Sequence, residues 1–307
     1  MVGEAVSQDF AIKKGTKQGD PVSPILFNSV LEQVMRKVKL RWSEKKYGVQ
    51  LGHVNSAIVT NLRFADDILL VGRSLPQIKR MLADVIDEGK KIGLELHPQK
   101  TKIQHNGIGY GSAVASVTVQ GMIIEVLEPS RSTMYLGRAM SFTNAHSTEL
   151  HHRLSKAWAK FGLFRNELTD RSVPLGLRLK LFQSILTPTV LYGCSSSVLT
   201  SAMEDKLRST QMKMLRTILG RRRLITDGGL ESWVDWVKRT TREARQALES
   251  HGVKDWVAVR LSQLQSWRKR LDGMPKQRWA KIAYEWSPEG TRRRGRPNTR
   301  WDEQVPS

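Results

Sequence analysis

Apolar positions in the first half of the chain switch between helical and strand spacing, which predicts a mixed α+β fold. Apolar residues recur every three to four positions from Pro24 to Trp42 and from Leu75 to Ile92, so each segment predicts a helix. Between them, residues 61–72 (NLRFADDILLVG) place an acidic pair between two apolar runs, which is typical of two strands joined by a tight turn. Shorter strands are predicted near 48–51, just before the Pro-containing turn of 93–103, and within 116–128 and 134–142.

From Glu149 onward the pattern is that of basic amphipathic helices. Helices are predicted within residues 149–168, 174–193, 202–220, 231–250 and 255–271, of which the last two are rich in tryptophan. This change of character predicts a boundary near residue 145. The chain closes with TRRRGRPNTRWDEQV at 291–305, which we expect to be a solvated basic tail.

Positive charge is concentrated in the helical half. The formal net charge is +21; residues 1–150 carry 19 basic and 14 acidic side chains, whereas residues 151–307 carry 31 and 15. Clustered Lys and Arg usually neutralise phosphates, so this surplus favours a nucleic-acid partner over a merely soluble basic protein. The single cysteine, Cys194, excludes an intramolecular disulfide and a zinc knuckle, and we expect it to be a small buried residue.

The chain shows no targeting or membrane-spanning segment. Its first residues, MVGEAVSQDFAIKKG, lack the apolar stretch of a signal peptide, and no run approaches the roughly 18 apolar residues that span a bilayer. We therefore expect a soluble intracellular protein without a membrane partner. VSQDFAI is typical of the end of a strand already in progress, so we expect the chain to be a fragment.

The adjacent Asp66 and Asp67 are the leading candidates for chemistry. Burying a carboxylate is costly unless a cation compensates it, so we expect a positive partner here. Carboxylate oxygens suit Mg²⁺, and nucleotidyl transfer uses two divalent ions roughly 4 Å apart to stabilise the attacking hydroxyl and the departing pyrophosphate. A Gly-rich loop (residues 13–23), a helix, the acidic pair, a second helix and Lys100 on a turn follow the order of a nucleotide-transferring palm domain. Neighbouring strand residues point to opposite faces, so we expect Asp66 to be the principal ligand.

Four ordered segments resemble conserved blocks of reverse transcriptases. They are KKGTKQGDPVSPILFN, FADDILLVG, GLELHPQKTK and TMYLG, and they span about 130 residues. QGDPVSPILFN and FADD, with VLYG and GRPNTRW farther on, are similar to LINE-type (non-LTR) retrotransposon sequences. The resemblance implies an RNA-directed DNA polymerase organised as a partial palm of antiparallel sheet and helices (1–145), an all-α thumb (146–222), a Trp-rich helical region (223–288) and a basic tail (289–307).

The resemblance also implies a role for each matching residue. Asp66 and Asp67 would hold two Mg²⁺ ions, or Mn²⁺ in their place, and Lys100 would neutralise or protonate the leaving pyrophosphate. Three residues would contact the incoming nucleotide and the template: Gln18, Gly19 and Phe64. Three more would form the primer grip: Tyr135, Leu136 and Gly137. The implied partners are an RNA template, a DNA primer or target and deoxynucleoside triphosphates, in the nucleus or in a cytoplasmic ribonucleoprotein.

Plainer alternatives stand beside these roles. Lys100 could be a solvated turn lysine, and Gln18 and Gly19 could be ordinary loop residues. The Trp-rich segments fit a packed core better than a base-stacking platform, because Trp at helical spacing buries well. The RGRP motif in the tail fits a hook for AT-rich minor grooves, a nuclear-localisation run or an RNA contact. Its candidate backbone-binding residues are Arg292, Arg293, Arg294 and Arg296.

One block of the family pattern is not found in these 307 residues. A palm needs a further aspartate in a block resembling F-x-D-x-x-x-A-F-D, and Asp9 and Asp20, the aspartates that precede the acidic pair, lack this context. Neither an endonuclease before the palm nor a Cys/His knuckle after it is found. Two classes of function stay open: part of an RNA-directed DNA polymerase that we expect to be inactive as this chain alone, or a catalytically dead remnant that only binds RNA or DNA.

Overall fold

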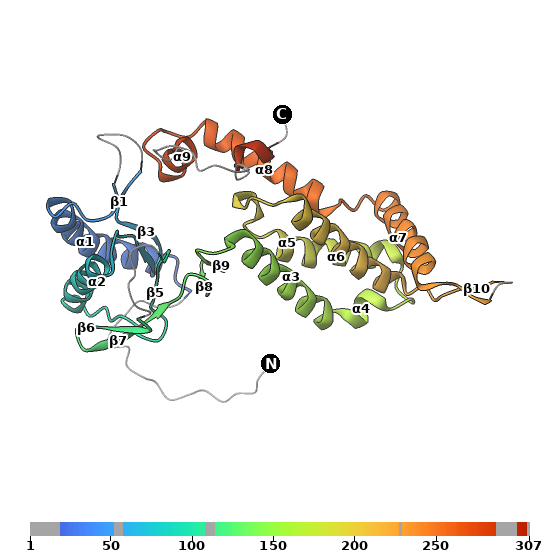
Figure 1. Cartoon of the computed structure of the whole chain (residues 1–307), viewed down its shortest axis with the longest axis horizontal. Coiled ribbons are helices and arrows are strands. Elements are labelled where there is room, and N and C mark those ends of the chain that lie inside the picture. The colour runs from blue at the N-terminus through green and yellow to red at the C-terminus, as the bar shows by residue number, and fades with distance from the viewer. Residues whose placement is uncertain (1–18, 52–57, 108–113, 227–228, 287–299, 306–307) are drawn as a thin grey trace. The chain divides into compact units, whose positions relative to one another are not determined.

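The α+β class is confirmed by the structure, a computed structural model that describes residues 19–51, 58–107, 114–226, 229–286 and 300–305 (Figure 1). The chain divides into two compact units. The first comprises residues 1–103 and 114–126, and the second comprises residues 104–113 and 127–307. Among the described residues, no helix is both long and apolar enough to cross a membrane.

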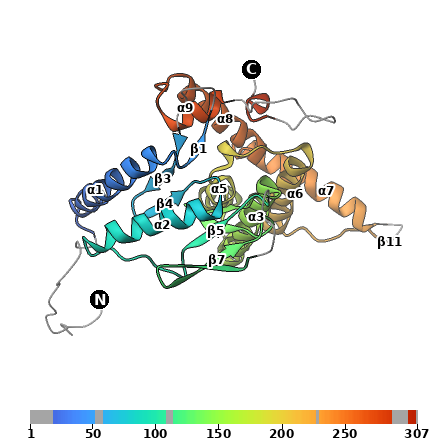
Figure 2. The same ribbon diagram turned by 60° about the vertical axis from the view of Figure 1, so that its left-hand side comes forward.

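The first unit combines two long helices with small antiparallel sheets. Its elements are α1 (Ser23–Glu44), β1 (Val49–Gln50), β2 (Ile58–Val59), β3 (Asn61–Phe64), β4 (Asp67–Leu70), α2 (Leu75–Lys90), β5 (Lys102–Gln104), β6 (Ser116–Val119) and β7 (Met122–Leu127). Strand β1 pairs with β2, β3 pairs with β4, and the other three form a sheet in the order β5-β7-β6. Figure 2 shows α1 and α2 lying side by side next to β3 and β4. The two helices begin and end close to the predicted bounds.

Helix α2 is buried on two faces. Met81 packs with Trp42 of α1 in one core cluster, whereas Ile86 packs against the three-stranded sheet in a second cluster. Such burial of apolar side chains is the main source of stability in a domain of this size. Leu70, at the end of β4, packs against both clusters. The β3–β4 hairpin is therefore anchored at its base, away from its tip.

The strand predicted before the Pro-containing turn is not formed. Gly93 adopts a left-handed φ of 77°, and the Leu94 N–H donates to the Gly89 carbonyl at 3.0 Å, which closes the end of α2. This cap uses the backbone donor that a strand at Leu94 would need. Pairing begins only after the turn, in β5.

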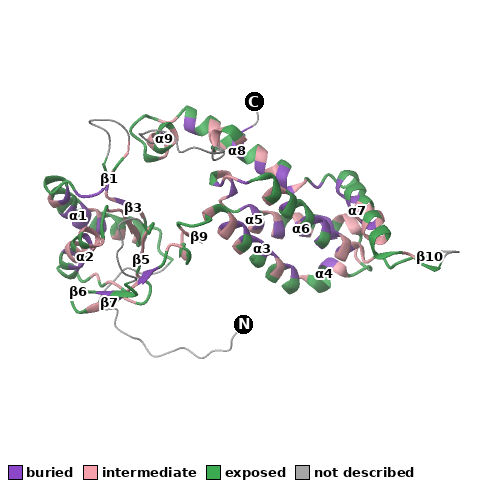
Figure 3. Cartoon of the chain, in the orientation of Figure 1, coloured by how far each residue is buried: buried purple, intermediate pink, exposed green. Residues whose placement is uncertain are grey.

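The second unit is a short hairpin followed by helices. Its elements are β8 (Thr133–Tyr135), β9 (Arg138–Met140), α3 (Ala145–Leu163), α4 (Arg165–Thr169), α5 (Leu175–Leu191), η1 (Cys194–Ser196), α6 (Ser201–Leu219), β10 (Ile225–Thr226), β11 (Gly229–Leu230), α7 (Trp233–Ser250), α8 (Trp256–Asp272), α9 (Trp279–Glu285) and η2 (Asp302–Gln304). Helices α3, α5 and α6 pack around one apolar core, and their buried faces are visible in Figure 3. The helix predicted over 149–168 is divided at Phe164, whose φ of −104° and ψ of 22° interrupt the helical path.

Burial is confirmed for some of the side chains predicted to lie in the core of this unit, but not for all of them. Trp256 is fully buried and stacks on Phe182 with ring centroids 5.7 Å apart, and Cys194 is buried, so these residues belong to the core as predicted. Trp233, in contrast, is 63% exposed. It precedes the part of α7 that faces the core, so helical spacing alone does not bury it.

Within the predicted basic tail, the described residues 300–305 contact the helical unit instead of extending freely into solvent. The Leu199 N–H donates to Oε1 of Gln304 at 2.9 Å, and the Gln304 amide donates back to the Leu199 carbonyl. The Trp301 indole N–H donates to the Ser195 carbonyl at 2.7 Å. Arg260, which is fully buried, also donates to Gln304. These paired polar groups stabilise the contact, so residues 300–305 dock on the helical unit.

Candidate functional site

The acidic pair lies at the tip of the β3–β4 hairpin. Phe64 and Asp67 face each other in the strand register, so Ala65 and Asp66 form a two-residue turn. Ala65 has a φ of 53°, the left-handed conformation that tight two-residue hairpins require. The hairpin predicted over 61–72 is confirmed, and it places Phe64, Asp66 and Asp67 together.

Both carboxylates are exposed, which corrects the expectation that the acidic pair is buried. Ile68 and Leu70 turn into the core cluster, whereas Asp66 and Asp67 extend into solvent. Neither carboxylate makes a hydrogen bond or an ion pair with any residue that the structure describes. Water hydrates a carboxylate at such a tip, so no compensating cation is needed. The oxygens of both side chains are consequently free to bind an added ligand.

The arginine of the hairpin, Arg63, forms an ion pair with an acidic residue of α1. Arg63 of β3 forms an ion pair with Glu32 of α1, with Nη2 and Oε2 2.7 Å apart, and Arg36 contacts the same carboxylate at 3.0 Å. The hydrogen bond from Arg63 holds the pKa of Glu32 below its ordinary value. This ion pair ties the hairpin to α1 and leaves Asp66 and Asp67 without a paired cation from the same hairpin.

The remaining predicted residues of the first unit are exposed where the structure describes them. Gly19 has a φ of 92°, in the region that favours glycine, and it lies just before α1; Gln18 lies outside the described residues. Phe64 is 67% exposed beside the acidic pair. Lys100 lies on the turn after Pro98, and its ammonium group has no partner within the described ranges.

The predicted primer-grip residues form the turn of the β8–β9 hairpin. Tyr135 pairs with Arg138, so Leu136 and Gly137 are the two turn residues. Their φ angles are 48° and 74°, again the left-handed region. This turn lies in the second unit, whereas the acidic pair and Lys100 lie in the first.

A buried ion pair at the start of α3 fixes this hairpin. Glu149 is 3% exposed; its Oε2 accepts the Ala139 N–H at 2.6 Å, and its Oε1 accepts Nε of Arg153 at 2.8 Å. Arg153 in turn donates to the Gly137 carbonyl. Sequence reasoning missed these two residues, because an i, i+4 Glu–Arg pair is also the commonest pattern of an exposed helix face.

The end of α5 completes the support of the turn. The Tyr192 hydroxyl donates to the Leu136 carbonyl at 3.0 Å, and the Arg153 guanidinium lies 4.8 Å from the centre of the Tyr192 ring. Arg138 donates to the Ser197 hydroxyl at 2.7 Å. The VLYG motif that marked this segment in the sequence therefore holds the YLG turn.

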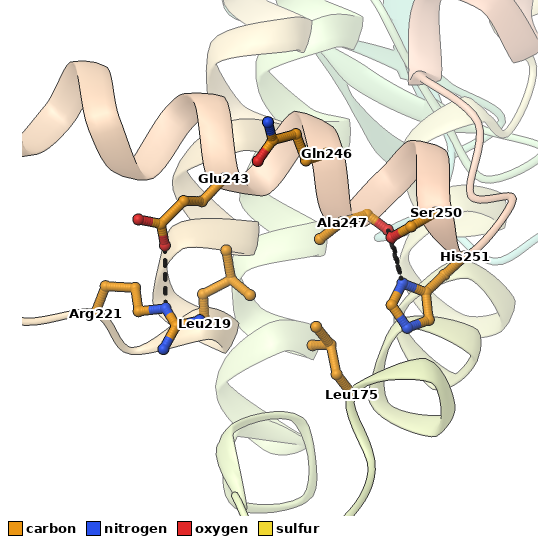
Figure 4. Close-up of a pocket in the computed structure, with 8 residues that line it drawn as sticks. All are labelled: Leu175, Leu219, Arg221, Glu243, Gln246, Ala247, Ser250 and His251. Atoms are coloured by element: carbon orange, nitrogen blue, oxygen red, sulfur yellow. Dashed lines mark hydrogen bonds and ion pairs between the residues drawn. The ribbon is translucent and has the colours of Figure 1, made fainter.

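Other parts of the described chain add no competing site. The described residues contain no group of three or more His, Cys, Asp or Glu side chains that could hold a metal ion. A pocket of about 280 Å³ lies between α5, α6 and α7, but none of its lining residues is a predicted site residue (Figure 4). Its polar side chains pair with one another, as in the Arg221–Glu243 ion pair at 3.0 Å. The candidate arginines 292, 293, 294 and 296 lie outside the described residues.

Comparisons with known proteins match the part of the chain that contains the acidic pair and the YLG turn. Residues 2–140 match the family model described as reverse transcriptase (RNA-dependent DNA polymerase). An uncharacterized transposon-derived protein of Caenorhabditis elegans is 27% identical over 263 residues, which cover 82% of this chain and 86% of that protein.

Two further relatives are retrotransposon polyproteins. The Pol polyprotein of the type-1 retrotransposable element R2 of Popillia japonica is 26% identical over 207 residues, 66% of this chain and 32% of that polyprotein. The Pol polyprotein of element R2DM of Drosophila melanogaster is 33% identical over 94 residues, 31% of this chain and 8% of that polyprotein. The chain thus spans about a third or less of these Pol relatives. On these matches, residues 2–140 belong to the reverse transcriptase family, and the chain is related to the non-LTR retrotransposons.

Proposed function

We propose that this chain carries two catalytic carboxylates, the primer grip and the thumb of an RNA-directed DNA polymerase. The observation that carries the proposal is the β3–β4 hairpin, which presents Asp66 and Asp67 in solvent with no partner among the described residues. Two adjacent carboxylates repel each other, and a bound divalent cation would neutralise both.

The residues of the tip fit a hard divalent cation. Mg²⁺ prefers oxygen ligands and retains substrate phosphates in its shell, so an open carboxylate pair suits it, and Mn²⁺ has a similar preference. Asp66 and Asp67 would hold the metal. When bound, the metal stabilises negative charge on the attacking 3′-hydroxyl and on the departing pyrophosphate. A complete two-ion site needs a further carboxylate, which these 307 residues do not supply in the expected sequence context.

The other residues position the substrates. Phe64, beside the carboxylates and near the primer terminus, contacts the incoming nucleotide and the template. Lys100 delivers a proton or a positive charge to pyrophosphate. Gln18 and Gly19 line the nucleotide and template loop. The YLG turn holds the primer. Because Glu149 already fixes the hairpin that carries this turn, primer binding costs less conformational entropy.

The proposal assigns residues 1–145 to the palm, 146–222 to the thumb, 223–288 to a Trp-rich region and 289–307 to a tail. We expect its partners to be an RNA template, a DNA primer or target and deoxynucleoside triphosphates, in the nucleus or in a cytoplasmic ribonucleoprotein. The excess of basic residues in 151–307 favours, as a second candidate, nucleic-acid binding without catalysis.

Primer extension on an RNA template separates the two candidates. The chain alone is compared with an extended polypeptide, in which a segment with an F-x-D-x-x-x-A-F-D block precedes residue 1. We expect no incorporation by the chain alone, because its metal site lacks one carboxylate, and Mg²⁺-dependent incorporation by the extended polypeptide.

Two outcomes would change this conclusion. Extension by the chain alone would show that the missing block is not required. An extended polypeptide that binds primer and template but incorporates nothing would favour the binding-only candidate. A polypeptide extended by the same block with its aspartates changed to asparagine is the matched control.

A further inference from the structure

Three consecutive serines after α5 lie between the β8–β9 hairpin and residues 300–305, which we call the chain end. We call Ser195, Ser196 and Ser197 the serine junction; it comprises the last two residues of η1 and the residue that follows. The junction, the hairpin and the chain end all belong to the second unit. The proposed function leaves this run of small polar residues without a role.

On one side, the serine junction holds an arginine of the hairpin. Nη2 of Arg138 donates to the Ser197 hydroxyl at 2.7 Å, and Nη1 donates to the Ser196 hydroxyl. The arginine also lies close to the backbone that precedes the junction, because a Cβ on Gly193 would be 2.9 Å from its Cδ. Arg138 pairs with Tyr135 directly across the YLG turn. A shift of the junction would therefore displace the side chain that flanks this turn.

On the other side, the backbone of the same junction is held at the chain end. The Trp301 indole N–H donates to the Ser195 carbonyl at 2.7 Å. The Ser197 carbonyl accepts Nη2 of Arg260 at 2.8 Å, and the same nitrogen donates to Oε1 of Gln304 at 2.5 Å. Ser197 is only 2% exposed. Its hydroxyl thus binds the hairpin, while its carbonyl binds the guanidinium that contacts the chain end.

Arg260 depends on the chain end for one of its acceptors. Its side chain is fully buried, and a buried guanidinium is stable only where its N–H groups are paired. Nη1 forms an ion pair with Glu204 at 3.1 Å, whereas Nε has no partner among the residues that the structure describes. Without Gln304, we expect the guanidinium to shift toward water and to loosen its hold on the Ser197 carbonyl.

Gln304 fits this place because an amide both accepts and donates. Its Oε1 accepts the Leu199 N–H at 2.9 Å, and its amide nitrogen donates back to the Leu199 carbonyl. Leu199 is 3% exposed, so its backbone groups need a partner from the protein. These polar contacts fix the register in which the chain end docks, which the packing of the buried Val305 alone would not do.

We propose that residues 300–305 position the YLG turn, acting through Gln304, Arg260 and the serine junction. The hairpin keeps its direct supports from Glu149 and Tyr192 when the chain end is lost, so we expect the turn to loosen and not to unfold. This coupling within the second unit is independent of catalysis, whereas its consequence for the primer rests on the proposed function. A loosened turn must be ordered by the primer itself, which weakens primer binding.

Hydrogen exchange measured by mass spectrometry on the full chain tests the coupling without any substrate. Gln304→Ala should accelerate exchange in a peptide that covers β8 and β9 about fivefold, the size of one lost hydrogen bond. The second half of α6, which reports unfolding of the whole unit, should exchange as before. Gln265→Ala, at an exposed glutamine of α8, is the matched control and should leave both segments unchanged.

A double variant tests whether the effect passes through the serine junction. Ser196→Ala with Ser197→Ala removes both hydroxyls that hold Arg138 but keeps the carbonyl that binds Arg260. Adding Gln304→Ala to this background should accelerate hairpin exchange no further, because the link to the hairpin is already broken.

Primer extension by the extended polypeptide tests the consequence for the primer. Gln304→Ala should raise the KM for primer by up to about fivefold, the factor by which the turn loosens, and should leave kcat unchanged. The proposal is overturned if Gln304→Ala leaves hairpin exchange unchanged, if α6 accelerates equally, or if the effect persists in the serine double variant. A looser hairpin with an unchanged KM would overturn the role in primer binding. No incorporation by the unsubstituted extended polypeptide would count against the proposed function and not against the coupling, which exchange measures separately.

Discussion

Asp66→Asn in the extended polypeptide is expected to lower single-nucleotide incorporation on an RNA template by about 10³-fold. Asparagine keeps the shape of the side chain but removes a negative metal ligand, and metal stabilisation of the transition state contributes several kcal/mol, at ~1.4 kcal/mol per tenfold in rate. Asp66 is the turn residue of an exposed tip, so the loss comes from ligand chemistry and not from unfolding.

Two further substitutions test whether the loss of incorporation is specific to Asp66. Asp67→Asn should have a smaller effect, because Asp66 is the expected principal ligand. Glu95→Gln, at an exposed carboxylate outside the hairpin, is the matched control and should leave the rate unchanged. Equal rates for Asp66→Asn and Glu95→Gln would contradict the assignment of the acidic pair to the metal site.

Glu149→Ala is expected to lower the melting temperature of the second unit by about 10 °C. The substitution leaves the buried guanidinium of Arg153 without its carboxylate, which typically costs about 3–5 kcal/mol, and a domain of this size loses about 2–4 °C per kcal/mol. It also removes the acceptor of the Ala139 N–H, so hydrogen exchange at that amide should accelerate more than exchange in α6.

Glu167→Ala provides the comparison for this prediction. Glu167 is an exposed carboxylate on the nearby short helix α4, and its removal should shift melting by no more than about 1 °C. A Glu149→Ala chain that melts with the unchanged chain, and whose Ala139 amide exchanges at the same rate, would show that the ion pair does not hold the hairpin.

Local patterns were sufficient for the elements that carry the candidate site. Apolar spacing located α1 and α2, and the two apolar runs around FADD located the β3–β4 hairpin, because each depends on residues that are neighbours in sequence. The same runs suggested buried aspartates. That inference failed because a tight turn projects its residues beyond the core that buries the strands on either side.

Contacts between distant residues could not be predicted in this way. Glu149 supports the YLG turn only because α3 packs beside β9, and its spacing from Arg153 is equally typical of an exposed pair. The docking of Gln304 on Leu199 joins residues 105 positions apart. Neither contact has a periodic signal, so the chain end was expected to be solvated and the support of the hairpin was not anticipated.

Counting bound Mn²⁺ by electron paramagnetic resonance tests directly whether Asp66 and Asp67 hold the metal ions. The extended polypeptide is mixed with an RNA template, a DNA primer and a non-hydrolysable deoxynucleotide, and Mn²⁺ stands in for Mg²⁺. We expect two tightly bound ions per chain, and the loss of tight binding when both Asp66 and Asp67 are changed to alanine. Two tightly bound ions in that double variant would contradict it.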